Sequence, residues 1–210
     1  MTVIDKNINK NAAAPIRRRR APEEARENIL VAAEAMLTAT GPQSLKLAQV
    51  AQAAGVSNAS VLHHFLSIDG VQAALMERMV RKLVDEILAL TERPTDTARG
   101  ATEGVTALFD AFEARGAARL AAWLELTGEG RRLTGVRAAI REVIDRRRAQ
   151  YPNVPAEVLE DFLLACITVA LGVGLFGSTL GELLGRPPGQ VRQVALALVL
   201  GQIQRSLGPV

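Results

Sequence analysis

An uncharged and largely apolar stretch of twenty residues, 162–181, limits most strongly what the protein can fold into. As a helix, this stretch is long enough to cross a bilayer. However, it contains Thr168, Ser178, Thr179 and four glycines, and its flanks are acidic rather than basic or aromatic. The pattern therefore favours a helix that is buried by other helices, and we expect no membrane span.

The rest of the chain also favours helices. Aromatic residues make up only 3% of the sequence, whereas Ala, Leu and Arg, which lose little side-chain freedom in a helix, are abundant. Apolar residues recur at spacings of three and four, as in Ile29, Leu30, Ala33 and Leu37, and no alternating strand pattern is present. We therefore predict an all-α fold of about nine helices.

Glycine and proline divide the chain into the expected helices. A first helix begins at Pro22 and ends before Gly41-Pro42, and a short helix at about 47–54 ends at Gly55. A second short helix runs to Phe65, and a long one extends from about Asp69 towards Pro94. The remaining expected ranges are 97–114, 117–127, 133–151, 155–184 and 191–207.

Basic charge is concentrated at the N-terminal end. Residues 1–82 carry 11 Lys and Arg against 7 Asp and Glu, whereas the remainder carries 14 against 15. Residues 1–21 have no hydrophobic period and contain Arg17, Arg18, Arg19 and Arg20, so we predict a disordered basic arm. This asymmetry favours a polyanionic partner for the first third of the chain, although a solvated tail remains an alternative.

The cysteine content and the N-terminal residues indicate in which cellular compartment the protein is expected. Cys166 is the only cysteine and lies in an apolar run, which indicates an inert buried thiol in a reducing environment. The first fifteen residues lack the apolar core of a signal peptide. We expect a cytoplasmic protein.

Residues 47–65 have the layout of a helix-turn-helix, which places one helix in a DNA major groove. Gly55 supplies the left-handed residue that the turn requires, and Ser57 offers an N-cap for the second helix. Ala51 and Val56 fit inward positions where the two helices cross closely.

This region resembles the TetR family of transcriptional repressors from about Ala25 to Leu75. The resemblance rests on RENILVAAEAML, then Gly41, then VAQAAGVSNASVLHHF and the long helix behind it. It implies a three-helix DNA-binding domain at residues 22–68 and a helical ligand-binding and dimerisation domain at residues 69–210. It further implies a homodimer through the last two helices and no enzymatic activity, catalytic residues or cofactor. The expected function is that of a repressor released from a palindromic operator on double-stranded DNA by a small, largely apolar effector.

Four positions depart from the family pattern. Lys46 stands where Thr or Ser usually opens the second helix, and Ala48 replaces a frequent Arg. Leu62 replaces a tyrosine that commonly contacts phosphate, and Ile68 replaces a lysine. Each lost phosphate contact should weaken DNA binding and lower its salt dependence by about one counterion. The arginine arm is a hypothetical compensation, because it can reach the flanking minor groove or the phosphates.

The first turn of the predicted recognition helix is the expected site of base contacts. Asn58 can pair with adenine, Ser60 can reach bases or phosphate, and Ala59 permits close approach or meets a thymine methyl group. Alternatively, Asn58 and Ser60 only cap the helix. The family pattern places His63 towards DNA and His64 beside the packed Phe65. The complete set of predicted DNA contacts is Arg17, Arg18, Arg19, Arg20, Lys46, Ser57, Asn58, Ala59, Ser60, His63 and His64.

Other roles for the two histidines have less support. Adjacent helical residues point about 100° apart, so His63 and His64 cannot readily chelate one metal ion. No nucleophile or Gly-rich phosphate loop accompanies the pair. We therefore predict neither a metal site nor acid-base catalysis.

An effector site among the middle helices would be mostly apolar. The candidate wall residues are Phe109, Phe112, Trp123, Leu126 and Cys166, with Arg119, Arg137 or Glu125 as possible orienting groups. The alternative for each wall residue, which the sequence favours, is plain core. Closer to the C-terminus, Gly172, Gly174, Gly177, Gly181, Ala195, Ala197 and Gly201 would allow close helix packing in a dimer.

The missing anchors at Leu62 and Ile68 leave one rival interpretation open. In this alternative, the protein is a helical enzyme or a membrane-associated module that keeps a degenerate helix-turn-helix as scaffold.

Overall fold

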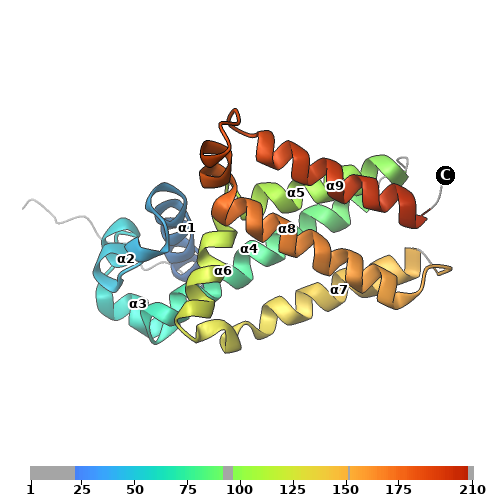
Figure 1. Cartoon of the computed structure of the whole chain (residues 1–210). Coiled ribbons are helices and arrows are strands. Elements are labelled where there is room, and N and C mark those ends of the chain that lie inside the picture. The colour runs from blue at the N-terminus through green and yellow to red at the C-terminus, as the bar shows by residue number, and fades with distance from the viewer. Residues whose placement is uncertain (1–21, 92–96, 151, 208–210) are drawn as a thin grey trace, which may run out of the picture.

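The computed structural model describes residues 22–91, 97–150 and 152–207, so the predicted arm with Arg17 to Arg20 lies outside the described residues. Within these ranges the chain forms nine α-helices and two short 3-10 helices, and no strand occurs there (Figure 1). The all-α prediction is confirmed. The helices are α1 (Pro22–Thr40), α2 (Leu47–Ala53), α3 (Asn58–Phe65), α4 (Ile68–Thr91), α5 (Thr97–Phe112), α6 (Ala117–Leu126), α7 (Thr134–Gln150), α8 (Ala156–Leu183) and α9 (Gln190–Leu207), with η1 (Pro42–Ser44) and η2 (Glu129–Arg132) between them.

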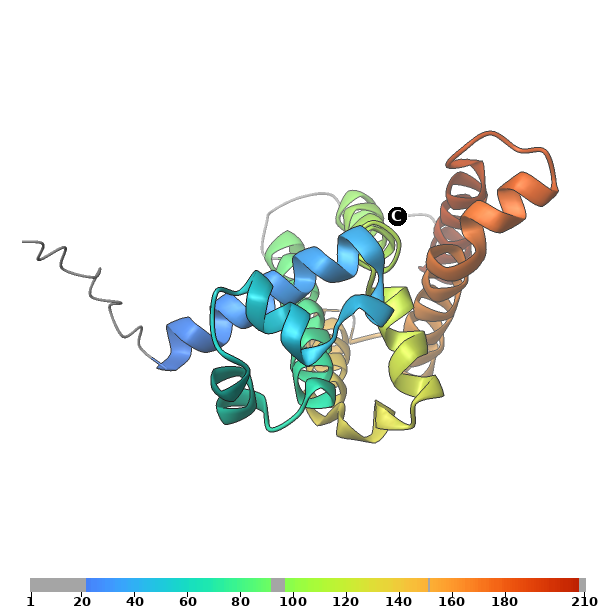
Figure 2. The same cartoon turned by 90° about the vertical axis from the view of Figure 1, so that its left-hand side faces the viewer.

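Helix α4 connects the two ends of the molecule. Helices α1, α2 and α3 gather at one end, and α4 leads away from α3 and runs between α5 and α7 (Figure 1). Seen along that direction, α1–α3 face the viewer, whereas α8 and α9 stand together at the side (Figure 2). The helix that follows α3 directly therefore packs against α5, α6 and α7.

The first core cluster joins the N-terminal helices to α6. Ile29 and Leu37 of α1, Val50 of α2 and Val61 of α3 are completely buried in it. Leu75 of α4 and Leu120 and Leu124 of α6 complete the same cluster. Each such side chain contributes about 1.5–3 kcal/mol through burial. The helix-turn-helix and α6 are thus stabilised by one shared core.

The second core cluster lies between α5, α8 and α9 and includes Phe109, Cys166 and Ala170. Burial raises the pKa of the Cys166 thiol to about 12, so this thiol stays protonated, as expected for an inert cysteine. Gly174 allows close packing here, because a Cβ at this position would lie 2.7 Å from the Phe112 carbonyl oxygen.

The packing partners of the α8 glycines differ from those predicted from the sequence. Gly174 faces Phe112 and Ala118 within the chain, and Gly177 and Gly181 are buried, each with Val191 of α9 nearby. Gly172 is exposed, with open space around it. Most of the glycine pattern that suggested contact with a second chain therefore serves packing inside the chain.

Helix α8 is long and apolar enough to cross a membrane, by length and composition alone. One side packs against α5, α6 and α9. Its other side exposes large apolar side chains: Leu164, Phe176, Leu180 and Leu183. Other helices of the chain therefore bury only one side of residues 162–181, whereas burial all round was expected.

Candidate nucleic-acid interface

The turn between α2 and α3 has the geometry predicted from the sequence. Gly55 adopts φ 65°, and the Val56 amide donates to the Ala51 carbonyl at 2.9 Å. The Ser57 hydroxyl accepts a hydrogen bond from the Ser60 amide at 3.2 Å and caps α3. The cap is thus the Ser57 side chain, so capping does not require the side chains of Asn58 and Ser60.

The pair α2–α3 is held firmly against α1. The Asn28 side chain donates to the Ala54 carbonyl at 2.7 Å, which ties α1 to the end of α2. Ala51 is buried at the helix crossing, and Val61 and Phe65 direct the inner side of α3 into the first core. These contacts fix which side of α3 faces outward.

The outward side of α3 carries most of the predicted DNA contacts. Asn58, Ala59 and His63 are exposed, and Ser60 and His64 are half-buried. Before this helix, Ser57 is exposed in the turn, and Lys46 is exposed at the N-cap position of α2. The structure therefore brings all predicted contacts that it describes to the exposed part of the helix-turn-helix.

The two histidines lie edge to face. Their ring centroids are 5.3 Å apart at an interplanar angle of 69°, and the His64 ring lies 6.3 Å from that of Phe65. Such an arrangement is typical of packed aromatic rings. In the part of the chain that the structure describes, no group of three His, Cys, Asp or Glu residues could hold a metal ion.

Two further residues lie at this surface and were not among the contacts predicted from the sequence. The Arg26 guanidinium of α1 lies 5.0 Å from the centroid of the Phe65 ring and is exposed beside the end of α3. Leu62 is 39% exposed on the outward side of α3. The signal for Arg26 was its place in the RENIL segment of the first helix. Leu62 was considered only for the loss of the tyrosine that it replaces.

The joint between α3 and α4 is a strained γ-turn. Leu66 has φ 66° and ψ −37°, and the Ser67 amide donates to the Phe65 carbonyl at 2.8 Å. The Ser67 hydroxyl then accepts from the Gly70 amide at 3.0 Å at the start of α4. A Cβ on Gly70 would collide with the Phe65 carbonyl oxygen. The recognition helix is therefore fixed on the first turn of α4.

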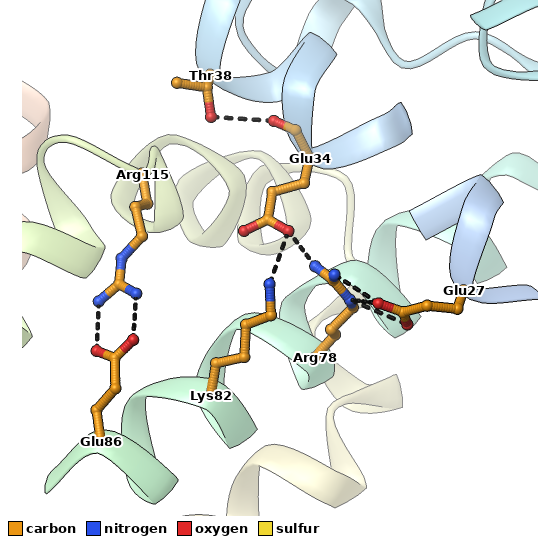
Figure 3. A network of polar contacts seen from close by, with 7 residues as sticks. All are labelled: Glu27, Glu34, Thr38, Arg78, Lys82, Glu86 and Arg115. Carbon is orange, nitrogen blue, oxygen red and sulfur yellow. Dashed lines mark hydrogen bonds and ion pairs between the residues drawn. The ribbon is translucent and has the colours of Figure 1, made fainter. Parts of the chain in front are cut away.

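An ion-pair cluster joins α4 to α1 (Figure 3). Arg78 of α4 lies between two carboxylates of α1, pairing with Glu27 at 2.6 Å and also with Glu34. Lys82 adds a contact to Glu34 at 3.3 Å. The hydrogen bond from Arg78 holds the pKa of Glu27 below its usual value. Because the Arg78 side chain is only 12% exposed, this clamp is partly shielded from water.

A second set of arginines continues these contacts towards α9. Arg115, after α5, makes two hydrogen bonds to Glu86 of α4, at 2.8 and 2.9 Å (Figure 3), and lowers the pKa of that carboxyl. Arg192 of α9 pairs with Asp110 at 2.6 Å and Glu113 at 3.1 Å. Charged contacts therefore connect α9 to α5, the α5–α6 turn to α4, and α4 to α1.

The candidate effector-site residues do not all lie together. Phe109 and Cys166 are buried in the second core, and the half-buried Phe112 packs against both cores. Trp123 is half-buried on α6, and Leu126 is 86% exposed at its end. Among the orienting groups, Arg119 donates to the Thr38 carbonyl at 3.3 Å, while Arg137 and Glu125 are exposed.

Comparisons with known proteins agree with this architecture. The family described as "Bacterial regulatory proteins, tetR family" matches residues 29–75, which contain the helix-turn-helix. No curated protein matches the chain.

Several solved structures share the fold along nearly their whole length. A transcriptional regulator from Rhodococcus sp. Rha1 has 21% identity and a TM-score of 0.64, over 86% of this chain and 96% of that one. The fatty acid degradation regulator FadR from Bacillus halodurans has 16% identity and a TM-score of 0.61, over 87% and 97%. A TetR-family regulator from Agrobacterium tumefaciens has 17% identity and a TM-score of 0.60, over 88% and 98%.

These structural likenesses concern the fold, and the match at residues 29–75 concerns the DNA-binding unit. Together with the exposed outward side of α3, they indicate a DNA-binding unit within residues 29–75. Residues 29–75 thus match the tetR family of bacterial regulatory proteins, and the chain shares the fold of solved transcriptional regulators.

Proposed function

We propose that the protein is a homodimeric repressor that binds a palindromic operator and is released by a small, largely apolar molecule. The observation that carries this proposal is the outward side of α3, which presents Asn58, Ala59 and His63 while Val61 and Phe65 anchor its inner side. In this proposal Lys46, Ser57, Ser60 and His64 contact the flanking backbone or bases. The domains are an arm at residues 1–21, a DNA-binding domain at 22–68 and a ligand-binding and dimerisation domain at 69–210.

Dimerisation through α8 and α9 is supported by their exposed apolar side chains. Phe176 and Leu180 of α8 and Val194 and Leu198 of α9 are each about half exposed or more. Exposed large apolar side chains that recur one helical turn apart are typical of an interaction surface. A two-fold dimer would cover it and present two recognition helices to a palindrome. Light scattering of detergent-free protein tests this proposal, and a detergent-dependent monomer would instead favour a membrane role for α8.

The proposed effector site lies among α5, α6 and α8. Phe112 supports this position because it is only half-buried and packs against both core clusters, beside the buried Phe109 and Cys166. Trp123 on α6 would report binding through its fluorescence, since it is the only tryptophan in the chain. Leu126 would join the site only if the end of α6 moved, because it is exposed in this structure.

The ion-pair cluster would couple movement at the proposed effector site to the DNA-binding helices. Arg78 clamps α4 to α1, and Arg115 ties α4 to the turn between α5 and α6. A ligand that prefers a different position of α5 and α6 would therefore displace α4 together with α1–α3. Such a shift changes the separation of the two recognition helices in a dimer.

A gel shift tests the DNA-binding role with full-length protein and duplex DNA selected from a random library. We expect sequence-dependent binding that weakens steeply with salt. Asn58→Ala should reduce affinity for the selected duplex by about tenfold. Equal binding to all duplexes, or none at low salt, would show that the helix-turn-helix is only a scaffold.

A further inference from the structure

The outward side of α3 has an apolar centre. Positions 58, 59, 62 and 63 follow the spacing of a single helix face, and all four side chains are exposed. Asn58 and His63 bring hydrogen-bonding groups to this face, whereas Ala59 and Leu62 are adjacent apolar residues between them. The face therefore combines polar side chains with an apolar strip.

Leu62 does not serve the core. Its neighbour Val61 and the later Phe65 are members of the first core cluster, whereas Leu62 is outside that cluster and 39% exposed. A single exposed leucine is common on protein surfaces. The position of this one matters, because it stands in the middle of the helix that the proposed function places in the major groove. Leucine has no donor for a phosphate, so this position cannot supply the phosphate contact that a tyrosine hydroxyl makes.

In the major groove, thymine presents an apolar group, its C5-methyl. We propose that Leu62, together with Ala59, contacts thymine methyl groups and thereby determines part of the operator sequence. This inference rests on the proposed function, in which α3 reads DNA.

The neighbouring residue extends the proposal. Asn58 precedes Leu62 by one helical turn and can pair with the N6 and N7 of adenine. An adenine contact and a thymine contact on one helix face suit a half-site rich in A·T pairs. Leu62 is therefore a specificity-determining residue rather than only a lost phosphate anchor.

The test uses full-length protein and a duplex selected from a random library, in which uracil replaces thymine at one position at a time. This exchange removes only the methyl group. We expect one or two positions in each half-site where uracil weakens binding by about threefold to tenfold, the effect of one lost methyl contact. In Leu62→Ala the same exchange should also weaken binding, but the logarithm of the loss of affinity should be less than half of the wild-type value.

Two variants control the interpretation. Val158→Ala removes an apolar side chain of α8 that is 38% exposed, close to the 39% of Leu62, and it should retain the full uracil effect. Leu62→Tyr should lose the uracil effect and gain salt dependence through a new phosphate contact. Thermal unfolding confirms that each variant is folded.

The outcomes separate the inference from the function on which it rests. If no duplex is selected and binding is absent at low salt, the DNA-reading function itself fails. If a duplex is selected but uracil has no effect at any position, the role of Leu62 is refuted. Equal uracil effects in the wild type and in Leu62→Ala would refute it as well, and would assign any methyl contact to another residue.

Discussion

The helix-turn-helix and the α8–α9 pair expose opposite kinds of surface. In the first region the large apolar side chains Val50, Val61 and Phe65 point inward. In the second, Phe176 and Leu198 point outward although α8 and α9 pack on each other. The first region is tied to α1 by the Asn28 hydrogen bond, whereas the second packs closely at the buried glycines of α8 and is tied to α5 by Arg192. The difference suits the proposed function, in which the first surface meets DNA and the second meets another copy of the chain.

The largest effect on the first region is expected from Gly70→Ala. The added Cβ would collide with the Phe65 carbonyl oxygen and displace the joint between α3 and α4. We expect the free energy of unfolding to fall by about 3 kcal/mol, the upper range for overpacking. Urea denaturation measures this loss. Gly100→Ala in α5 is the matched control, since its nearest neighbour would be 4.0 Å away, and it should be neutral or stabilising. Equal behaviour of the two variants would contradict a tight joint.

The second region is best tested by Phe176→Glu, which places a charge on the exposed apolar side of α8. If a second chain covers this surface, burying the charge should weaken dimerisation by about 2–4 kcal/mol. Sedimentation at several concentrations measures the dimer constant. Leu126→Glu, also at an exposed leucine, should leave the dimer unchanged. A dimer that tolerates Phe176→Glu would place the interface elsewhere.

Removal of the Arg78 clamp should have a smaller effect. Arg78→Met keeps much of the side chain but leaves Glu27 and Glu34 without their guanidinium partner. Glu27 is mostly exposed and its pairing is screened by water, so we expect a loss of about 1–2 kcal/mol.

The pH dependence checks the same clamp. Arg78 depresses the pKa of Glu27, so the stabilisation is present above the unfolded pKa of about 4.3 and is lost as pH falls through the folded value. The stability difference between wild type and Arg78→Met should therefore shrink below about pH 4. A difference that stays constant down to pH 2 would indicate lost packing rather than lost ion pairing.

The smallest effect is expected from Leu66→Gly at the γ-turn. Positive φ at a leucine costs about 1–3 kcal/mol, and glycine removes this strain at an entropic cost of about 0.5–1 kcal/mol. Because Leu66 is 86% exposed, its side chain contributes little packing. The variant should gain about 0.5–1 kcal/mol in thermal unfolding. Destabilisation instead would mean that the Leu66 side chain makes a contact of its own.

Features set by local chemistry were predictable from the sequence. The Gly55 turn, the Ser57 cap and the order of the helices depend on neighbouring residues and periodicity, and the structure confirms them. The outward positions of Asn58 and His63 follow from the same helical spacing.

Contacts between distant residues were not predictable in this way. No local pattern brings Arg78 to Glu27 or Arg192 to Asp110, because these pairs depend on how whole helices pack. Leu126 was placed with the effector-site candidates because it is apolar, yet it falls at an exposed helix end. The γ-turn at Leu66 was missed because leucine rarely adopts positive φ.

Hydroxyl-radical footprinting of full-length protein on its selected duplex, combined with the stoichiometry of the complex, tests most directly how the two surfaces work together. We predict two chains on each duplex and two symmetry-related protected half-sites, with centres separated by about one helical turn of 10–10.5 base pairs or a multiple of it. One chain on a single protected segment, or protection independent of sequence, would contradict a dimer that reads DNA through α3.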